Sequence, residues 1–323
     1  MNKRALEELA TEPRAQTTVN ARQLSRRFGA HAAVREIDLT LRRGEVLGLL
    51  GPNGAGKTTT MQMLTGNLSP SNGSISICGI DLVEHPVPAK RHIGYLPEHP
   101  PLYRELTVDE FLRLAGRLHG MARTPLQKAI ESVKTRCGLA DSGKRLLGSL
   151  SKGYQQRVGI AQAILHDPDV VVLDEPTVGL DPIQIREIRS LIRALGEERS
   201  VILSTHILSE VEAACDRVEI MHLGRIVFSD TIAALDAFTR GLALQAAFRH
   251  PPPAATLAAL PGINRIEALG QNQFLLGRDP SHDPTDEIVN RSVAEGWGLY
   301  ELGPAHSRLE DVFVQLTRDE PAA

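Results

Sequence analysis

One short segment of the chain combines glycines, a lysine and threonines in a spacing that can bind phosphate. Its pattern is Gly, four residues, Gly, Lys, then Ser or Thr. The residues are Gly51, Pro52, Asn53, Gly54, Ala55, Gly56, Lys57, Thr58 and Thr59. Glycines let the backbone curl so that its N–H groups point at phosphate oxygens. In such a loop the lysine reaches the β- and γ-phosphates, and the hydroxyl after it binds Mg²⁺. Lys57 and Thr58 are therefore the predicted residues for these two roles.

The residues on either side predict the two elements that a phosphate-binding loop requires. Glu45–Leu50 is rich in apolar residues and short enough to be a buried strand, and Thr60–Leu64 predicts a helix. The beginning of that helix presents its positive end to the same anion. The alternative is a glycine-rich turn with an accidental lysine. A strand and a helix in the places that the motif demands favour the phosphate loop.

Two adjacent acidic residues, Asp174 and Glu175, follow the continuous apolar run Val170–Leu173. Such a run is typical of a strand that is buried on both faces. An acid that closes a buried strand can hold the Mg²⁺ shell, which predicts this role for Asp174. Glu175 can face the γ-phosphate and deprotonate the attacking water. A pair of solvated acids at a strand end is the alternative, and these two residues alone do not decide between them.

A second segment, Leu150–Arg157, predicts another anion-binding helix start. Ser151 is a residue type that favours the N-cap, and Gly153 leaves the first turn of a helix over Tyr154–Leu165 unencumbered. The free N–H groups at that turn attract anions. A single nucleotide rarely needs two such helix starts from one subunit. Two copies packed head-to-tail would let each Ser151 turn close over the nucleotide of the other copy. A capped helix without further function is the alternative.

Composition and charge limit the classes of protein that this chain can be. The chain has 323 residues, a formal net charge of −3 and 42% hydrophobic residues. The charge gives no global attraction to nucleic acid or to an anionic membrane. Cys78, Cys137 and Cys215 are scattered, so we expect reduced thiols in the cytosol and no disulfide framework. No apolar run is long enough to cross a bilayer, and the start of the chain has no apolar export signal.

The order of expected strands and helices predicts an α/β domain with a largely parallel sheet over about residues 17–235. Residues 1–16 are a polar N-terminal tail. Val201–Ser204 predicts a second buried strand, after the amphipathic stretch Ile183–Leu195. Within the domain, Thr107–Leu147 lacks strand patterns and has helical spacing. We expect a helical subdomain at about residues 100–150, inserted into the α/β core.

The sequence pattern changes near Asp230, and the prolines at 251–253 break any helix. Both features indicate that a second unit follows. We expect a small α+β domain over residues 240–318. Its predicted elements are a strand pair at Ile263–Ile266 and Phe274–Leu276, a helix at Thr285–Ala294, a strand at Gly298–Tyr300 and a closing helix at Leu309–Phe313.

These motifs, in this order, resemble the nucleotide-binding subunits of ATP-binding-cassette (ABC) transporters over about Thr17–Phe228. Leu150–Gln155 is similar to the family signature motif. Asp181 corresponds to the D-loop aspartate, which in the family communicates across a dimer. His206 corresponds to the switch histidine at the γ-phosphate. Phe28 corresponds to the aromatic residue that stacks on adenine, although a core phenylalanine is the competing interpretation.

The resemblance implies a P-loop ATPase of the ABC type whose cofactors are ATP and Mg²⁺. Two copies would sandwich two nucleotides, as a homodimer or as a heterodimer, with Ser151 and Gly153 of one copy at the phosphates of the other. Glu175 and His206 would be the catalytic residues. A separate integral-membrane permease would be the partner, on the inner face of the cell membrane, and no nucleic acid is expected.

One position departs from the family pattern, because the Q-loop glutamine falls at Glu98. Ionised glutamate can accept hydrogen bonds and bind Mg²⁺, but it cannot donate as a glutamine amide does. We therefore expect metal ligation by Thr58, Glu98 and Asp174. The strings around Glu98 and Ser151, with Leu309–Phe313, resemble the branch of drug, polysaccharide and gliding-motility exporters whose membrane subunit is a separate polypeptide.

Two alternatives to a transport role remain at this stage. Some ABC ATPases are soluble switches in translation or on DNA, but those usually have fused double cassettes or long coiled-coil insertions. This chain has one cassette, no heptad insertion and no basic block. The C-terminal unit can also be a regulatory binding module. No ligand constellation is visible there, and His250 and His282 are expected to be surface residues.

Overall fold

The computed structural model describes residues 17–240, 243–279 and 281–305. By their internal contacts these residues divide into two compact units, and the division falls after Ser229. We describe each unit by itself. The expected closing helix at Leu309–Phe313 lies outside the described residues.

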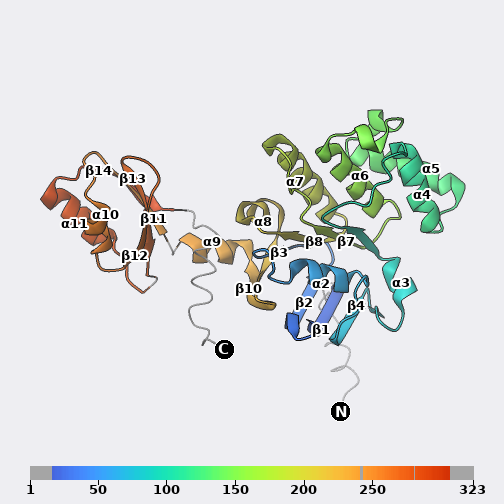
Figure 1. Ribbon diagram of the computed structural model, residues 1–323, viewed down its shortest axis with the longest axis horizontal. Helices are drawn as coiled ribbons and strands as arrows, with labels where there is room; N and C mark the ends of the chain where they lie inside the picture. Colours follow the sequence, from blue (N-terminus) through green and yellow to red (C-terminus); the bar gives the residue numbers. More distant parts are fainter. Residues whose placement is uncertain (1–16, 241–242, 280, 306–323) are drawn as a thin grey trace, which may run out of the picture. The chain divides into compact units, whose positions relative to one another are not determined.

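A six-stranded sheet forms the centre of the first unit (Figure 1). Its strands, in spatial order, are β10 (Arg225–Thr231), β9 (Arg217–His222), β3 (Val46–Leu50), β8 (Ser200–Thr205), β7 (Val170–Asp174) and β6 (Ile93–Leu96). The pairs from β9 to β6 are all parallel. Every residue of β3, β7 and β8 is buried, which matches the apolar runs Val46–Leu50, Val170–Leu173 and Val201–Leu203 within them. The α/β fold class is thus confirmed.

An antiparallel sheet lies beside this core and was not anticipated from the sequence. Its order is β2 (His31–Arg42), β1 (Thr17–Phe28), β4 (Asn72–Ile77) and β5 (Ile80–Asp81). We expected strands and helices to alternate from residue 17, but the alternation begins only at β3. A two-residue turn at Gly29, whose φ is 58°, returns the chain directly from β1 into β2. This hairpin pairs Phe28 with His31.

Helices connect the strands and supply the helical subdomain (Figure 1). In chain order they are α2 (Lys57–Leu64), α3 (Pro86–Lys90), α4 (Val108–Leu118), α5 (Arg123–Arg136), the short 3₁₀ turns η2 (Ala140–Ser142) and η3 (Leu147–Ser149), α6 (Lys152–Ile164), α7 (Pro182–Gly196) and α8 (Leu208–Ala214). Helices α4 and α5 and the two 3₁₀ turns fall in the expected insertion. Helix α4 begins with a capping box between Thr107 and Glu110.

The core of the first unit lies between its two sheets. Apolar residues of β1, β2 and β4 pack there with Leu47 and Leu49 of β3 and with Met61 and Met63 of α2. Helix α2 contacts β2, β7 and β8, so it is held between the sheets. The loop before α2 therefore has a rigid base. No helix among the described residues is both long and apolar enough to cross a membrane.

The second unit is α+β, with a four-stranded antiparallel sheet in the order β12, β13, β11, β14 (Figure 1). Its elements in chain order are α9 (Ile232–Arg240), β11 (Ala243–Phe248), α10 (Ala254–Ala258), β12 (Ile263–Ala268), β13 (Gln273–Arg278), α11 (Thr285–Glu295) and β14 (Leu299–Pro304). Phe248 anchors the core and meets Trp297 edge-on, with ring centroids 5.9 Å apart. The alanine-rich strand β11 was not predicted, although it lies between two partners.

Candidate functional site

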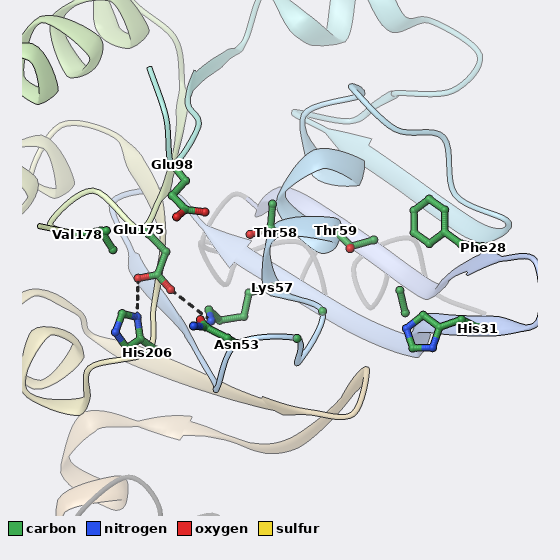
Figure 2. Close-up of a pocket in the computed structure, with 13 residues that line it drawn as sticks. Phe28, His31, Asn53, Lys57, Thr58, Thr59, Glu98, Glu175, Val178 and His206 are labelled. Carbon is green, nitrogen blue, oxygen red and sulfur yellow. Dashed lines mark hydrogen bonds and ion pairs between the residues drawn. The ribbon is translucent and has the colours of Figure 1, made fainter. Parts of the chain in front are cut away.

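A pocket of about 440 Å³ opens at the carboxyl ends of β3, β7 and β8 (Figure 2). Its lining residues are Phe28, His31, Ala33, Asn53, Gly54, Gly56, Lys57, Thr58, Thr59, Glu98, Glu175, Val178 and His206. In parallel sheets the loops at the carboxyl ends of the strands form the usual ligand site. Residues that lie up to 178 positions apart in the chain, Phe28 and His206, thus face one cavity.

The predicted phosphate loop has the backbone that its glycines suggested. Gly54 and Gly56 have φ values of 82° and 106°, which side-chain-bearing residues rarely adopt. A Cβ on Gly56 would stand 2.6 Å from the Ala33 carbonyl oxygen, so close approach also requires glycine there. Within the loop, Gly51 and Ala55 are buried, and Pro52 is half-buried. Helix α2 then begins at Lys57 with its free N–H groups at the pocket.

Lys57 lies on the floor of the pocket with its ammonium group close to three oxygen atoms. Its Nζ donates to the Gly51 carbonyl at 2.8 Å and to the Pro52 carbonyl at 3.3 Å, and it lies 3.3 Å from Glu175 Oε1. Both Lys57 and Glu175 are buried. The ammonium group is held where the anionic group of a ligand would meet it. In the chain without ligand, the Glu175 carboxylate balances the positive charge of Lys57.

Glu175 lies between Lys57 and His206, as the dashed lines in Figure 2 show. His206 Nδ1 is 2.9 Å from Glu175 Oε2. Glu175 has φ = 47°, in the left-handed region, where a non-glycine residue costs on the order of 1 kcal/mol or more. Its N–H donates to the Ser204 hydroxyl at 2.9 Å, which fixes this conformation. Strain of this kind is concentrated at functional sites.

Asp174 is fully buried, and its two oxygens differ in their surroundings. Oδ1 accepts hydrogen bonds from the Ser204 hydroxyl at 2.5 Å and the Thr58 hydroxyl at 3.4 Å. Oδ2 is buried without a hydrogen-bond partner among the described residues. Burial raises the pKa of Asp174, an effect that the hydrogen bonds from Ser204 and Thr58 oppose and that nearby Glu175 and Glu98 reinforce. A buried, unpartnered carboxylate oxygen beside a hydroxyl is suited to a cation.

Glu98 faces the same part of the pocket from the loop after β6, with its carboxylate on the side of Thr58 (Figure 2). It is partly exposed, and its other neighbour is the exposed His99, whose Nδ1 is 4.0 Å from Glu98 Oε1. Thr58, Asp174 and Glu98, the three predicted metal ligands, therefore converge. They offer only oxygen atoms, the donor type that Mg²⁺ prefers.

Phe28 and His31 stand together at the end of the pocket away from Glu175 (Figure 2). The β1–β2 hairpin pairs these residues directly. Phe28 is 48% exposed, and the Arg26 guanidinium carbon lies 4.7 Å from the centroid of its ring. Phe28 is therefore not a core residue, which removes the competing interpretation from the sequence. A flat ligand can stack on its open face.

Ser151, Gly153 and Asp181 were also predicted site residues, and among the described residues none of them lines this pocket. Ser151 is exposed at the N-cap position of α6, but its side chain makes no capping hydrogen bond, contrary to the expected cap. Helix α6 begins at Lys152, two residues before the expected start. Gly153 is buried, and a Cβ there would stand 2.5 Å from Gln184 Oε1, so a side chain has no room. Asp181 Oδ1 caps α7 by accepting the N–H groups of Ile183 and Gln184.

Sequence reasoning missed some residues of the site. His31, Ala33 and Val178 line the pocket, and Ser204 supports both Asp174 and Glu175. His31 follows from the β1–β2 register, which pairs it with Phe28. Val178 is three residues after Glu175 and offered no chemical signal. Ser204 is one of several small polar residues at the ends of strands, so only the β7–β8 pairing singles it out.

Comparison with known proteins agrees with this geometry. The sequence model of the ABC transporter family matches residues 34–178, which include the predicted phosphate loop, Asp174 and Glu175. The chain is 41% identical to the ABC transporter ATP-binding protein NatA of Bacillus subtilis over 205 residues, 63% of this chain and 83% of that protein.

Similarity also extends into the second unit. The chain is 33% identical to the Nod factor export ATP-binding protein I of Ralstonia nicotianae over 300 residues, 92% of each chain. A solved structure described as the ATP-binding subunit of an ABC transporter superposes with a TM-score of 0.63 and 33% identity, over 69% of this chain and 93% of that one. The resemblance inferred from the motifs is confirmed. The chain belongs to the ABC transporter family, and within it to the ATP-binding subunits, which are ATPases.

Proposed function

We propose that two copies of this chain bind two Mg²⁺–ATP between them, hydrolyse them, and drive export through a separate integral-membrane permease. The main support for the proposal is that some of the predicted phosphate-binding and catalytic residues line the pocket and others do not. Lys57, Glu175 and His206 converge on one pocket. Ser151 is exposed, with a side chain that makes no capping bond. The pocket thus holds one part of the predicted phosphate contacts, and in this proposal a second copy supplies Ser151 and Gly153.

Residues 51–59 hold the triphosphate in this proposal, with backbone N–H groups around the phosphates and Lys57 at the β- and γ-phosphates. Phe28 stacks on adenine from its exposed face. When the triphosphate enters, the Lys57 ammonium turns from Glu175 Oε1, now 3.3 Å away, towards phosphate oxygen. Glu175 Oε1 then becomes available to a water molecule.

Glu175 acts as the general base, and His206 positions it. Nδ1 of His206 holds Glu175 Oε2 at 2.9 Å, which leaves Oε1 as the oxygen that accepts the proton from water. The opposite edge of the imidazole ring is available to a γ-phosphate oxygen, because the His206 side chain is 41% exposed. Most of the rate enhancement comes from positioning and electrostatics, as is general for phosphoryl transfer.

Thr58, Asp174 and Glu98 would hold Mg²⁺ in this proposal. The unpartnered, buried Oδ2 of Asp174 fits such an ion, and so does the all-oxygen donor set. Bound Mg²⁺ supplies positive charge that offsets the charge of the β- and γ-phosphates. Glu98 contributes an acceptor only, so it binds the ion and does not donate a hydrogen bond to the attacking water.

Each copy contains every proposed catalytic residue, which supports a homodimer with two competent sites; a heterodimer with a related subunit follows the same geometry. Ser151 and Gly153 of one copy then meet the γ-phosphate held by the other, and Asp181 lies near the dimer interface. The ATPase domain comprises residues 17–235, with the helical subdomain at about 100–150. Residues 240–318 are the proposed accessory domain, and residues 1–16, the expected tail, lie outside the described residues.

Similarity to known proteins supports two further parts of the proposal. These are the direction of transport, which is export, and a location at the cytoplasmic face of the membrane. The Nod factor export protein from Ralstonia nicotianae is similar over nearly the whole chain, including the second unit. Exposed Tyr103 and Leu146 on the helical subdomain offer the permease an apolar contact. Loss of membrane association after deletion of the neighbouring membrane-protein genes supports this role. A chain that stays bound to ribosomes or DNA in that strain contradicts it.

The sandwich dimer is tested with Glu175→Gln, which keeps the shape of the side chain and removes the base. The variant should bind ATP, lose turnover by about 10²–10⁴-fold and elute as an ATP-dependent dimer from a sizing column. The matched control is Glu175→Gln combined with Lys57→Ala, which should stay monomeric because ATP is not retained. Undiminished hydrolysis by Glu175→Gln would remove Glu175 from its role.

A further inference from the structure

Three potential metal ligands meet at the end of the sheet that lies away from the nucleotide pocket. Cys78 Sγ, a ring nitrogen of His92 and a carboxylate oxygen of Asp169 all lie within 4.8 Å of one another. His92 Nδ1 is 2.7 Å from Asp169 Oδ2. All three residues are partly buried, so an ion can reach them from solvent. The proposed function uses none of them.

The fold brings these residues together from three separate parts of the chain. His92 and Asp169 immediately precede the paired parallel strands β6 and β7, where Ile93 lies opposite Val170. The Val170 N–H donates to the His92 carbonyl at 3.0 Å, which fixes the two strand starts side by side. Asp169 is five residues before Asp174, so β7 separates the two acids by roughly 16 Å.

Cys78 comes from the antiparallel sheet, and its backbone is strained. It forms the turn between β4 and β5 with Gly79, because Ile77 pairs with Ile80. Its φ of 50° is in the left-handed region, where turns of this type favour asparagine, aspartate or glycine. The Cys78 N–H donates to the Thr18 carbonyl at 2.8 Å, which holds the conformation. A cysteine with a left-handed backbone conformation lowers the stability of the fold. The presence of Cys78 at this position therefore calls for a functional explanation.

We propose that Cys78, His92 and Asp169 bind one Zn²⁺ ion. A thiolate, an imidazole and a carboxylate are all Zn²⁺ ligands, and the sulfur donor disfavours Mg²⁺. Three protein ligands with water as the fourth complete a tetrahedral site. The ion takes the place of the hydrogen bond between His92 and Asp169, and the Cys78 thiol proton is released to solvent. The Arg43 guanidinium lies 3.8 Å from Asp169 Oδ1, the carboxylate oxygen that does not bind the ion in this proposal. Arg43 therefore orients the carboxylate so that Oδ2 faces the ion.

The consequence is a link between the two sheets of the first unit. Cys78 belongs to the turn of the antiparallel sheet, and His92 and Asp169 belong to the starts of two strands of the parallel sheet. Bound Zn²⁺ therefore stabilises the chain against unfolding, by an amount set by its concentration relative to its Kd. This effect does not require ATP, so the site remains testable even where the proposed ATPase roles fail.

The test uses tag-free, nucleotide-free protein treated with EDTA, titrated with Zn²⁺ by calorimetry and separately with Co²⁺ by absorption. Wild type should bind one Zn²⁺, and Co²⁺ should give the near-ultraviolet charge-transfer band that a thiolate ligand produces. Cys78→Ser, His92→Ala and Asp169→Asn should each weaken Zn²⁺ binding by about 10-fold or more. At the same Zn²⁺ concentration, the Tm of wild type should rise more than the Tm of Cys78→Ser.

Cys137→Ala is the matched control, because it also leaves two cysteines but removes a thiol that is only 1% exposed. It should bind Zn²⁺ as wild type does. Absence of Zn²⁺ binding by wild type overturns the proposal. Equal binding by all three ligand variants also overturns it and assigns the ion to another set of residues. The Co²⁺ spectrum of wild type tests the thiolate ligand even where a variant fails to fold.

Discussion

His206 Nδ1 lies 2.9 Å from Glu175 Oε2, although the two residues are 31 positions apart. The contact exists because β7 and β8 are parallel neighbours, so that Asp174 lies opposite Ser204 and the residues after each strand meet. Ser204 strengthens the junction by accepting the Glu175 N–H and donating to Asp174. Glu175 and His206, the proposed base and its proposed positioning residue, are thus brought together by strand register.

Removal of the His206 ring should slow hydrolysis more than it weakens ATP binding. In His206→Ala the Glu175 carboxylate loses the group that holds Oε2, while the proposed phosphate contact of Lys57 is untouched. We expect kcat to fall by about 10²-fold or more and the Kd for ATP to change little. Steady-state kinetics and nucleotide titration measure the two quantities. His85→Ala, an exposed histidine before α3, is the control, and an unchanged kcat in His206→Ala would exclude the positioning role.

Lys57→Ala should weaken binding of ATP itself. It removes the ammonium group that is proposed to contact phosphate, a charged interaction with an expected net contribution of about 1.5–3 kcal/mol. The same change leaves the buried Glu175 carboxylate without its lysine partner, which destabilises the fold. Lys57→Ala with Glu175→Gln removes that charge and should recover Tm without recovering ATP affinity. Affinity that matches wild type in Lys57→Ala would contradict the phosphate-loop assignment.

Asp174 should make the ligand-free chain less stable as the pH rises. Its pKa is raised by burial, so the folded state binds the proton more tightly than the unfolded state. Stability from this group is therefore complete at low pH and is lost from the ordinary aspartate pKa near 4 upwards. Asp174→Asn should raise Tm in EDTA at pH 7.5, and the gain should shrink towards pH 4.5. A gain that is equal at both pH values would contradict this account.

Loss of the Phe28 ring should affect nucleotide and inorganic triphosphate differently. The ring is exposed at the far end of the pocket from Glu175, with Arg26 packed against it. Phe28→Ala should weaken ATP binding by roughly 1–3 kcal/mol, the usual contribution of an aromatic ring stacked on a base. Binding of tripolyphosphate, which has no base, should be unchanged. An equal loss for both ligands would show that the substitution distorts the phosphate loop.

Local patterns predicted much of the site. Residues 51–59 form their loop because glycines stand where φ is positive, and this information is contained within nine residues. The run Val170–Leu173 is apolar throughout, so the burial of β7 and the position of Asp174 at its end followed. Long-range pairing was not accessible in this way. The Glu175–His206 contact, the Ser204 bridges and the Cys78 cluster all depend on strand register.

Two features that were not predicted correctly from the sequence, strand β11 and the capping role of Ser151, have physical explanations. Strand β11 is rich in alanine, which favours helices, but its place between β13 and β14 overrides that propensity. Ser151 is a residue type that caps helices, and it occupies the N-cap of α6 without a capping bond. Its hydroxyl is therefore available to a group outside the helix, which is what the sandwich requires. Residue type alone does not separate these two uses.

Mixing two inactive variants tests the central claim most directly. In the proposed dimer each site combines Glu175 of one copy with Ser151 of the other. Glu175→Gln and Ser151→Arg should each abolish turnover when alone. A mixed dimer places both defects in one site and restores the second, so an equal mixture combined before ATP is added should recover roughly a quarter of the wild-type rate. A mixture as inactive as either variant alone, although mixed dimers form, would contradict a site shared between two copies.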